Sequence, residues 1–354
     1  MKKPIKVLIV DDSALVRKIF TEVLSKDDEI EVIGTAPNPI IARDKIVLLK
    51  PDILLLDIEM PEMDGLTFLE KLMRHYPMPV IIISSLAKES SDVAYRALEL
   101  GAAEVLSKPG SSYSVKDMSE QLIEKIKGIA QMKKVKPPAI VKNQTAETSL
   151  SSRKAASSKA LLRTTDKIIA IGASTGGTEA IKHIVTRLPE EVPPILITQH
   201  MPQFFTKSFA ENLNRQSRVT VKEAEDKEPA TPGKVLIAPG NKHMVLNRSG
   251  SFYFVEIKDG PLVHHQRPSV EVLFYSVAQI AGRNAIGVIL TGMGKDGAEG
   301  LLEMRRSGAF TIAQDEESSV VFGMPKEAIA IGAAMRVLSL SQIPEIILQI
   351  GLSG

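Results

Sequence analysis

The sequence predicts an α/β protein with two doubly wound parallel-sheet domains. Short runs of β-branched and aliphatic residues alternate with amphipathic helical segments in both halves of the chain. Such alternation is typical of parallel sheets that are covered by helices on both faces. The length of 354 residues also exceeds what one core usually serves, at about 150 residues per domain. We therefore expect two domains and a linker.

The first domain is expected to span residues 1–130. Its predicted strands are the runs Lys6–Val10, Glu31–Gly34, Ile53–Ile58, Val80–Ser84 and Glu104–Leu106. Amphipathic segments after these runs predict helices that begin near Ser13, Pro39, Asp64, Glu89 and Val115.

Residues 131–163 have the composition of a linker. The run Lys133–Pro138 is basic and contains prolines, and the stretch after it is rich in Ser, Thr, Ala and Lys without an aromatic residue. Such a segment cannot bury enough apolar surface to form a core. We expect a flexible basic tether, and a patch for nucleic acid or lipid is the alternative.

The second domain, residues 164–354, is expected to be Rossmann-like with an antiparallel insertion. Its predicted parallel strands are Lys167–Ile171, Ile195–Thr198, Ala285–Leu290 and Ala309–Ala313. The strand-rich stretch Val219–Ile257 contains a hairpin turn at Asn247–Gly250. Helices are expected at Phe205–Asn214, Val270–Ala281, Ala298–Arg306, Pro325–Ile331 and Pro344–Ile350.

Composition excludes several function classes. The formal net charge is only +2, so the whole chain offers no electrostatic attraction for nucleic acid or an anionic membrane. There is no cysteine, which excludes disulfides, thiolate metal sites and a cysteine nucleophile. The apolar run Val7–Val10 is too short for a secretion signal, and no segment approaches the ~18 apolar residues of a membrane span. A cytoplasmic protein without direct membrane insertion is expected.

Polar residues follow the strand ends of the first domain. In a doubly wound sheet, ligands bind beyond the carboxyl ends of the strands, and the residues expected there are Asp11, Asp12, Asp57, Ser84 and Lys108. Clustered carboxylates repel one another unless a divalent cation joins them, and oxygen ligands suit Mg²⁺. The alternative for Asp11 or Asp12 is to cap the helix that begins near Ser13.

The joint pattern resembles the response-regulator receiver domain over residues 5–127. It consists of Asp11-Asp12, Asp57 with Met60-Pro61 and Asp64-Gly65, Ser84-Ser85, and Lys108-Pro109. The resemblance implies a flavodoxin-like fold in which Asp57 accepts a phosphoryl group from a partner histidine kinase.

The same resemblance implies roles for the neighbouring residues. Asp12, Asp57 and the backbone carbonyl of Glu59 would bind Mg²⁺, with Asp11 supporting the metal through water. Ser84 and Lys108 would bind the phosphoryl oxygens. Receivers often carry an aromatic switch residue three positions before the lysine, and this chain has Val105 there, so signalling through an aromatic rotamer is not implied.

The second domain contains a candidate hydrolytic triad at three strand ends. Gly172–Gly177 fits the G-x-S-x-G pattern that exposes a serine hydroxyl, here Ser174, although a phosphate-binding glycine loop would also fit. A serine needs a base, and His200 follows the next strand. Asp296 follows a third strand and could orient the imidazole. The alternative for Asp296 is an N-cap of the following helix.

Other readings of the second domain compete with the triad. Gly292–Gly297 is a literal G-x-G-x-x-G after a strand, with Asp315 about twenty residues on, so a dinucleotide-binding oxidoreductase is an alternative. A DNA-binding output would need a basic recognition helix, and none is evident. His264-His265 is not expected to bind metal, because adjacent residues on an extended chain point to opposite sides.

The second domain resembles the catalytic domain of the chemotaxis protein-glutamate methylesterases from about residue 166 to 350. The shared motifs are Gly172–Gly177, Gln199–Pro202, Arg267–Val270 and Thr291–Gly297, in the family's order and behind a receiver. The resemblance implies hydrolysis of glutamate γ-methyl esters on methyl-accepting chemotaxis receptors, with methanol released, and deamidation of selected receptor glutamines.

The methylesterase resemblance also implies residue roles. Ser174 would be the nucleophile, His200 the general base and Asp296 the orienting carboxylate. Met293 would contribute a backbone N–H to oxyanion stabilisation, and Thr175 would support the site by hydrogen bonding. No cofactor is implied for this domain.

Overall fold

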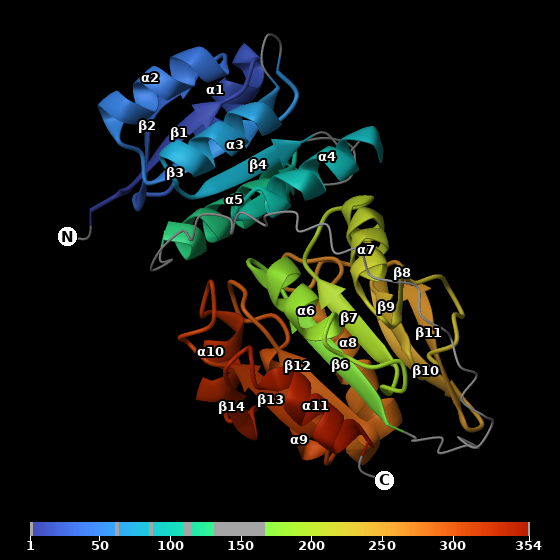
Figure 1. Cartoon of the computed structure of the whole chain (residues 1–354). Coiled ribbons are helices and arrows are strands. Elements are labelled where there is room, and N and C mark those ends of the chain that lie inside the picture. The colour runs from blue at the N-terminus through green and yellow to red at the C-terminus, as the bar shows by residue number, and fades with distance from the viewer. Residues whose placement is uncertain (1–2, 61–63, 85–87, 109–114, 131–166, 353–354) are drawn as a thin grey trace.

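The computed structural model describes residues 3–60, 64–84, 88–108, 115–130 and 167–352 (Figure 1). The expected linker at 131–163 lies outside the described residues, as do Pro61, Ser85 and Pro109 of the receiver pattern. The boundaries expected between the domains therefore stay predictions.

The first domain is a parallel sheet of five strands in the order β2-β1-β3-β4-β5. This order is that of flavodoxin-like folds. The strands are β1 (Ile5–Val10), β2 (Ile30–Ala36), β3 (Ile53–Asp57), β4 (Val80–Ser84) and β5 (Glu104–Ser107). The helices are α1 (Ala14–Leu24), α2 (Pro39–Leu49), α3 (Gly65–His75), α4 (Lys88–Glu99) and α5 (Val115–Ala130).

Helices cover both faces of this sheet. Phe20 of α1 and Ile126 of α5 pack against one face, whereas Ile46 of α2, Leu69 of α3 and Ala94 of α4 pack against the other. The strands between them are buried on both sides, which explains their nearly continuous runs of aliphatic residues.

Helix α1 is capped by Ser13 and not by either aspartate before it. The Ser13 hydroxyl accepts a hydrogen bond from the Val16 N–H, and Asp11 Oδ1 accepts one from the Ser13 N–H. The capping alternative for Asp11 and Asp12 is therefore wrong, and both carboxylates remain available at the strand end.

The second domain is a seven-stranded parallel sheet in the order β14-β13-β12-β6-β7-β9-β8, with a separate antiparallel hairpin of β10 and β11. The strands are β6 (Ile168–Ala173), β7 (Ile195–Gln199), β8 (Thr220–Glu223), β9 (Lys234–Ile237), β10 (His243–Ser249), β11 (Phe252–Lys258), β12 (Ala285–Ile289), β13 (Phe310–Gln314) and β14 (Arg336–Leu338). The helices are α6 (Gly177–Val185), α7 (Phe205–Gln216), α8 (Val270–Ala281), α9 (Ala298–Arg306), α10 (Met324–Ala330) and α11 (Ile343–Leu352), and a 3₁₀ turn spans Gly282–Asn284.

The sequence expectation needs two refinements here. Only β10 and β11 of the strand-rich stretch are antiparallel, because β8 and β9 pair in parallel and extend the main sheet. Strand β14 was not expected, since three residues are too short to show a period.

The topology reverses between β12 and β6. From β6 the chain crosses through α6 to β7 on one side, and from β12 it crosses through α9 to β13 on the other side. Helices α6, α7 and α11 cover one face, while α8, α9, α10 and the hairpin cover the other. The loops after β6 and β12 therefore meet at a topological switch point, where α/β folds place their ligands.

The first domain sits on the second with α4 and α5 facing it (Figure 1). Tyr95 of α4 packs on Phe209 of α7, with ring centroids 6.1 Å apart. None of the described helices combines the length and apolar composition that a membrane crossing needs.

Replacing the buried Phe274 by alanine should destabilise the second domain by about 3–5 kcal/mol, because a fully buried aromatic side chain leaves a cavity. Its neighbour Tyr275 is 40% exposed, so Tyr275→Ala should cost under about 1 kcal/mol. Urea denaturation followed by circular dichroism measures both. Equal losses would contradict the packing of α8 described here.

Candidate functional site

The three residues of the predicted triad lie at one edge of the second sheet. Ser174 follows β6, His200 follows β7 and Asp296 lies in the loop after β12, and these three strands are neighbours. All three side chains are buried. The His200 N–H donates to the Ala173 carbonyl at 3.1 Å, which joins the ends of β6 and β7 next to Ser174.

Asp296 is held by three hydrogen bonds at the N-terminus of α8 and by one to His200. Its Oδ2 lies 2.7 Å from His200 Nε2 and accepts from the Val270 N–H at 2.7 Å, and its Oδ1 accepts from the Ser269 hydroxyl at 2.7 Å and the Glu271 N–H at 3.1 Å. Burial favours the protonated form, but these bonds and the facing His200 outweigh it and hold the pKa of Asp296 below its ordinary value. The carboxylate is therefore ionised.

The alternative reading of Asp296 as the cap of the following helix is wrong. The N-cap of α9 is Gly297, with φ +90° and no side-chain cap hydrogen bond. Asp296 instead satisfies amides at the start of α8, a helix that precedes it in the chain. Anions are favoured there because the first N–H groups of a helix lack partners within it.

The Asp296 contact assigns the two nitrogens of His200. Because Nε2 faces the carboxylate, Nε2 carries the proton in the neutral ring and Nδ1 is the basic atom. Nδ1 is buried and has no hydrogen-bond partner within the described part of the chain. It is thus the atom available to take a proton from the serine.

Close backbone packing surrounds Ser174. The Ser174 N–H donates to the Thr291 carbonyl at 3.0 Å. A Cβ on Gly292 would lie 2.8 Å from Ser174 Cβ, so only a glycine lets the loop after β12 approach this closely. Gln199 donates to the Ser174 carbonyl at 2.9 Å and closes the other side.

Two backbone amides beside Ser174 are available for an oxyanion. Among the described residues, the N–H groups of Thr175 and Met293 have no acceptor, whereas those of Ser174, Gly292 and Gly323 are bonded within the loops. Unpaired N–H groups next to a nucleophile are what an oxyanion hole requires.

The same packing argues against a dinucleotide in the glycine loop. A Cβ on Gly297 would lie 2.4 Å from Val270 Cγ1, so the loop is seated against α8. Asp315, the acidic residue that follows this glycine pattern, accepts a hydrogen bond from the Ser318 hydroxyl at 2.6 Å.

The first domain reaches this site through two buried side chains that the sequence analysis missed. Glu104 of β5 accepts a hydrogen bond from the Thr175 hydroxyl at 2.7 Å and pairs with Lys125 of α5 at 2.7 Å. Thr175 therefore bonds to the first domain and not to the triad. The one sequence signal for Glu104 was its position: it is an acidic residue in a short strand whose pattern predicts burial.

Helix α5 also lies directly on the loop after β12. A Cβ on Gly128 would come within 2.7 Å of the Met293 sulfur, and one on Gly294 within 2.4 Å of Glu124 Oε1. Further along α5, Glu120 lies 2.9 Å from His265 Nδ1. The first domain thus covers the candidate oxyanion amide and the loop of Asp296.

The predicted phosphoacceptor residues meet at the carboxyl edge of the first sheet. Asp57 Oδ2 lies 2.6 Å from Lys108 Nζ, and Asp57 Oδ1 accepts from the Glu59 N–H at 3.1 Å. Burial raises the pKa of Asp57 to about 6, and the Asp11 charge adds to it, although Lys108 and the Glu59 N–H act in the opposite direction. Ser84 ends the adjacent strand and is buried.

These residues fit a divalent cation. Asp11, Asp12 and Asp57 each offer a carboxylate oxygen within 4.8 Å of the others. Asp11 Oδ2 is buried 3.1 Å from Lys108 Nζ and accepts no hydrogen bond from the described residues. Oxygen-only ligands suit Mg²⁺.

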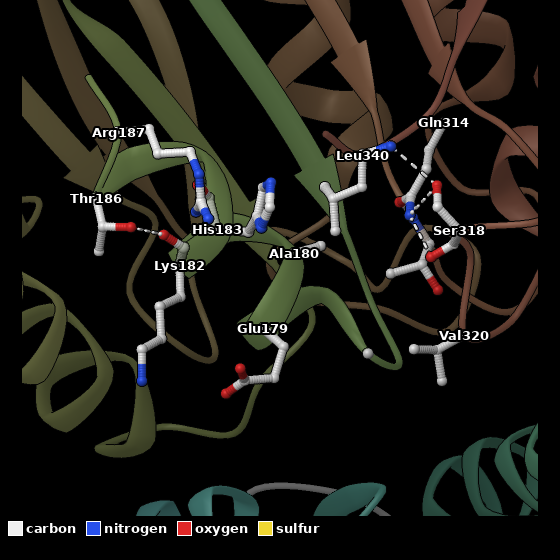
Figure 2. Close-up of a pocket in the computed structure, with 12 residues that line it drawn as sticks. Glu179, Ala180, Lys182, His183, Thr186, Arg187, Gln314, Ser318, Val320 and Leu340 are labelled. Atoms are coloured by element: carbon white, nitrogen blue, oxygen red, sulfur yellow. Dashed lines mark hydrogen bonds between the residues drawn. The ribbon is translucent and has the colours of Figure 1, made fainter. Parts of the chain in front are cut away.

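A hollow of about 340 Å³ is lined by residues of α6 and of the segments after β13 and β14 (Figure 2). His183 and Ala180 of α6 line one wall, and Ser318 and Leu340 line the other. Burial and the neighbouring Arg187 lower the pKa of His183. None of the triad residues lines the hollow, so the hydrolytic groups lie outside it.

Comparison with known proteins identifies a family for each of the two domains. Residues 169–347 match the CheB methylesterase family model, and residues 7–120 match the response regulator receiver domain. The chain belongs to the CheB methylesterase family. It is 58% identical over 341 residues to "Protein-glutamate methylesterase/protein-glutamine glutaminase 2" of Syntrophus aciditrophicus, which covers 96% of this chain and 97% of that protein.

Two further relatives support the assignment. The Salmonella typhimurium protein-glutamate methylesterase/protein-glutamine glutaminase is 53% identical over 343 residues, which is 96% of this chain and 95% of that protein. The crystal structure of the Thermotoga maritima CheB methylesterase catalytic domain is 43% identical with a TM-score of 0.51, covering 52% of this chain and 98% of that one. This family member is therefore a hydrolase that carries its own receiver domain.

Because Gly128 lies against Met293, Gly128→Leu should push the receiver off the catalytic domain and raise ester hydrolysis by the unphosphorylated chain. A loss of ~1.4 kcal/mol in docking corresponds to about tenfold more open enzyme while the closed state dominates. Turnover of the two proteins measures this effect.

Ala130→Leu is the matched control, because Ala130 is an exposed residue of the same helix. It should leave turnover unchanged. If Gly128→Leu also leaves turnover unchanged while the protein stays folded, the receiver does not limit access to Ser174.

Proposed function

We propose that the chain hydrolyses glutamate γ-methyl esters of methyl-accepting chemotaxis receptors and releases methanol. The observation that carries this proposal is the buried Asp296–His200 pair at 2.7 Å, whose members follow β12 and β7, the two neighbours of the strand that precedes Ser174. The pair supports the proposal because acyl-transfer hydrolysis by a serine requires an oriented base.

The proposed reaction proceeds in two halves. His200 Nδ1 takes the Ser174 proton as Oγ attacks the ester carbonyl, and the N–H groups of Met293 and Thr175 stabilise the oxyanion. The imidazolium returns the proton to the departing methoxide, which leaves as methanol. Water, deprotonated by His200, then attacks the acyl-enzyme, and the receptor glutamate leaves with a free γ-carboxylate. His200 returns the proton to Ser174 Oγ, which restores the hydroxyl. A glutamine carboxamide would follow the same route with ammonia as the leaving group.

Asp296 has an electrostatic role in both halves. It keeps the proton of neutral His200 on Nε2 and stabilises the imidazolium that forms when Nδ1 is protonated. Its remaining hydrogen bonds at α8 keep the carboxylate ionised.

Phosphorylation of Asp57 by a chemotaxis histidine kinase would control access to this site. Asp12, Asp57 and the Glu59 carbonyl would hold Mg²⁺, with Asp11 acting through water, and the metal would neutralise charge on the phosphoryl group. Ser84 and Lys108 would bind the phosphoryl oxygens.

Strand β5 offers a route from this site to the triad. Lys108 follows β5 directly, and Glu104 at the start of the same strand accepts from Thr175. Val105 lies between them in place of an aromatic residue. We infer that phosphorylation shifts β5 and the Glu104–Lys125 pair, and so favours the undocked receiver.

The proposed partners indicate the cellular compartment in which the enzyme acts. A kinase phosphodonor and the helical signalling parts of receptors meet in the cytoplasm, and we place the enzyme there. No nucleic-acid partner is part of this proposal, and residues 131–163 are proposed to tether the receiver while it is undocked.

Ser174→Ala, His200→Ala and Asp296→Ala should each lower methanol release from methylated receptor by about a thousandfold or more, because a triad acts as a unit. Asp296→Ala should be the mildest of the three. Lys295→Ala, at an exposed neighbouring position, should retain normal turnover. Near-normal turnover in folded Ser174→Ala would rule out the covalent route.

A small phosphodonor with Mg²⁺ should accelerate the intact enzyme, and Asp57→Ala should abolish this response without lowering basal turnover. Asp44→Ala, at an exposed carboxylate of α2, should respond as the wild type does. Methanol release with and without the phosphodonor measures both variants. An Asp57→Ala enzyme that is still activated would show that another residue accepts the phosphoryl group.

A further inference from the structure

A second buried carboxylate lies behind the triad. Glu271 is 6% exposed, and one of its oxygens lies within 4.8 Å of an Asp296 oxygen and a His264 ring nitrogen. Four hydrogen bonds already engage Asp296, so we do not interpret this cluster as a metal site. Neither the proposed mechanism nor the sequence motifs give Glu271 a role.

The side chain of Glu271 caps a neighbouring helix. Its Oε2 accepts from the Gly297 N–H at 2.8 Å, and the carboxylate also accepts from the Gly300 N–H. Both amides belong to the start of α9, where Gly297 supplies no side-chain cap. Glu271 of α8 therefore performs the capping that α9 lacks.

This cap acts on the loop that carries Asp296. Gly297 follows Asp296 directly, and the Glu271 backbone N–H donates to Asp296 Oδ1 at 3.1 Å. Glu271 thus binds the Asp296 carboxylate through its backbone N–H. Its side chain binds the N–H of Gly297, the residue after Asp296. A shift of Gly297 would move the carboxylate away from His200.

We infer that Glu271 is a positioning residue of the hydrolytic site, which fixes Asp296 against His200 and places a second negative charge behind it. The inference rests on the proposed hydrolysis by Ser174, His200 and Asp296. It adds to the proposed mechanism, because two carboxylates then stabilise the His200 imidazolium: Glu271 on α8 and Asp296 in the loop after β12.

The groups around Glu271 make the ionisation of its carboxylate depend on pH near neutrality. Burial raises the pKa of Glu271 to about 7; the Gly300 and Gly297 amides oppose the shift, and Asp296 and Glu299 add to it. The titratable groups that face it are Asp296, His264, Glu299 and Tyr275. An ionised Glu271 stabilises the imidazolium of His200, so its loss should favour the neutral ring.

The test compares Glu271→Gln with Glu271→Ala in the full chain, activated with phosphodonor and Mg²⁺. Glutamine keeps an acceptor for the Gly297 amide but carries no charge. We expect its kcat to stay within about threefold of wild type, and the rising limb of the rate against pH to move down by about half a pH unit. Alanine loses the cap as well, so kcat should fall about tenfold or more at unchanged KM.

Glu299→Gln is the matched control, because Glu299 is exposed in the first turn of α9. It should shift the pH profile by less than Glu271→Gln. Unchanged kcat in Glu271→Ala, or a Glu271→Gln profile that superimposes on wild type, would overturn the inference. Thermal melting of each variant separates a loss of kcat from a loss of fold.

A readout without turnover separates this inference from the proposed function. In Ser174→Ala, the ¹⁵N resonances of the His200 ring report its protonation directly. Adding Glu271→Gln should move that titration to lower pH whether or not the wild type hydrolyses receptor esters. An unmoved titration would overturn the role of Glu271, whereas an inactive wild type with a moved titration would overturn only the proposed function.

Discussion

The hydrolytic site depends on one buried anion at the N-terminus of a helix. Asp296 is buried, and an isolated carboxylate in such a position would take up a proton. The first amides of α8, the Ser269 hydroxyl and His200 together keep it charged. That charge orders the imidazole, so the atom left for Ser174 is Nδ1. This is the reverse of the serine-protease arrangement, in which the aspartate contacts Nδ1.

The parallel sheet brings Ser174, His200 and Asp296 close together, so that no long side chain is needed to join them. Strands β12, β6 and β7 are neighbours whose carboxyl ends meet where the topology reverses. Glycines make the approach of the loops possible, since a Cβ on Gly292 would collide with Ser174 and one on Gly297 with Val270. The backbone thus sets the geometry of the site. The N–H groups of Ser174 and Gly292 are bonded within the loops and are not available to an oxyanion.

The receiver uses a different kind of contact. Glu104 and Lys125 form an ion pair buried at the domain interface, and Thr175 completes the hydrogen bonding of the carboxylate. Both partners of this ion pair belong to the receiver, so docking buries the pair and joins it to the second domain through the Thr175 hydroxyl. The cost of desolvating the two charges offsets much of the gain from that hydrogen bond. An interface of this kind is compatible with the undocking that we propose for the phosphorylated receiver.

Local sequence patterns were sufficient to predict both sheets and the residues at their edges. Buried strands and amphipathic helices leave a periodic signal. A polar residue that ends such a strand, as Asp57 does, or directly follows one, as Ser174 and His200 do, is placed by the strand itself. The sequence carried weaker signals for the direction of strand pairing and for very short strands. The parallel pairing of β8 and β9 depends on their partners in the sheet, and β14 is too short to be periodic.

Tertiary packing alone decided which polar groups meet. Asp296 contacts His200 across 96 residues and Ser269 across 27, and Glu104 contacts Thr175 across 71. The sequence around Asp296 favours a cap of α9 as readily as a triad member, and the structure gives that capping role to Glu271. No periodicity or motif encodes these contacts, because each depends on how separate helices and strand ends pack once the sheets have formed.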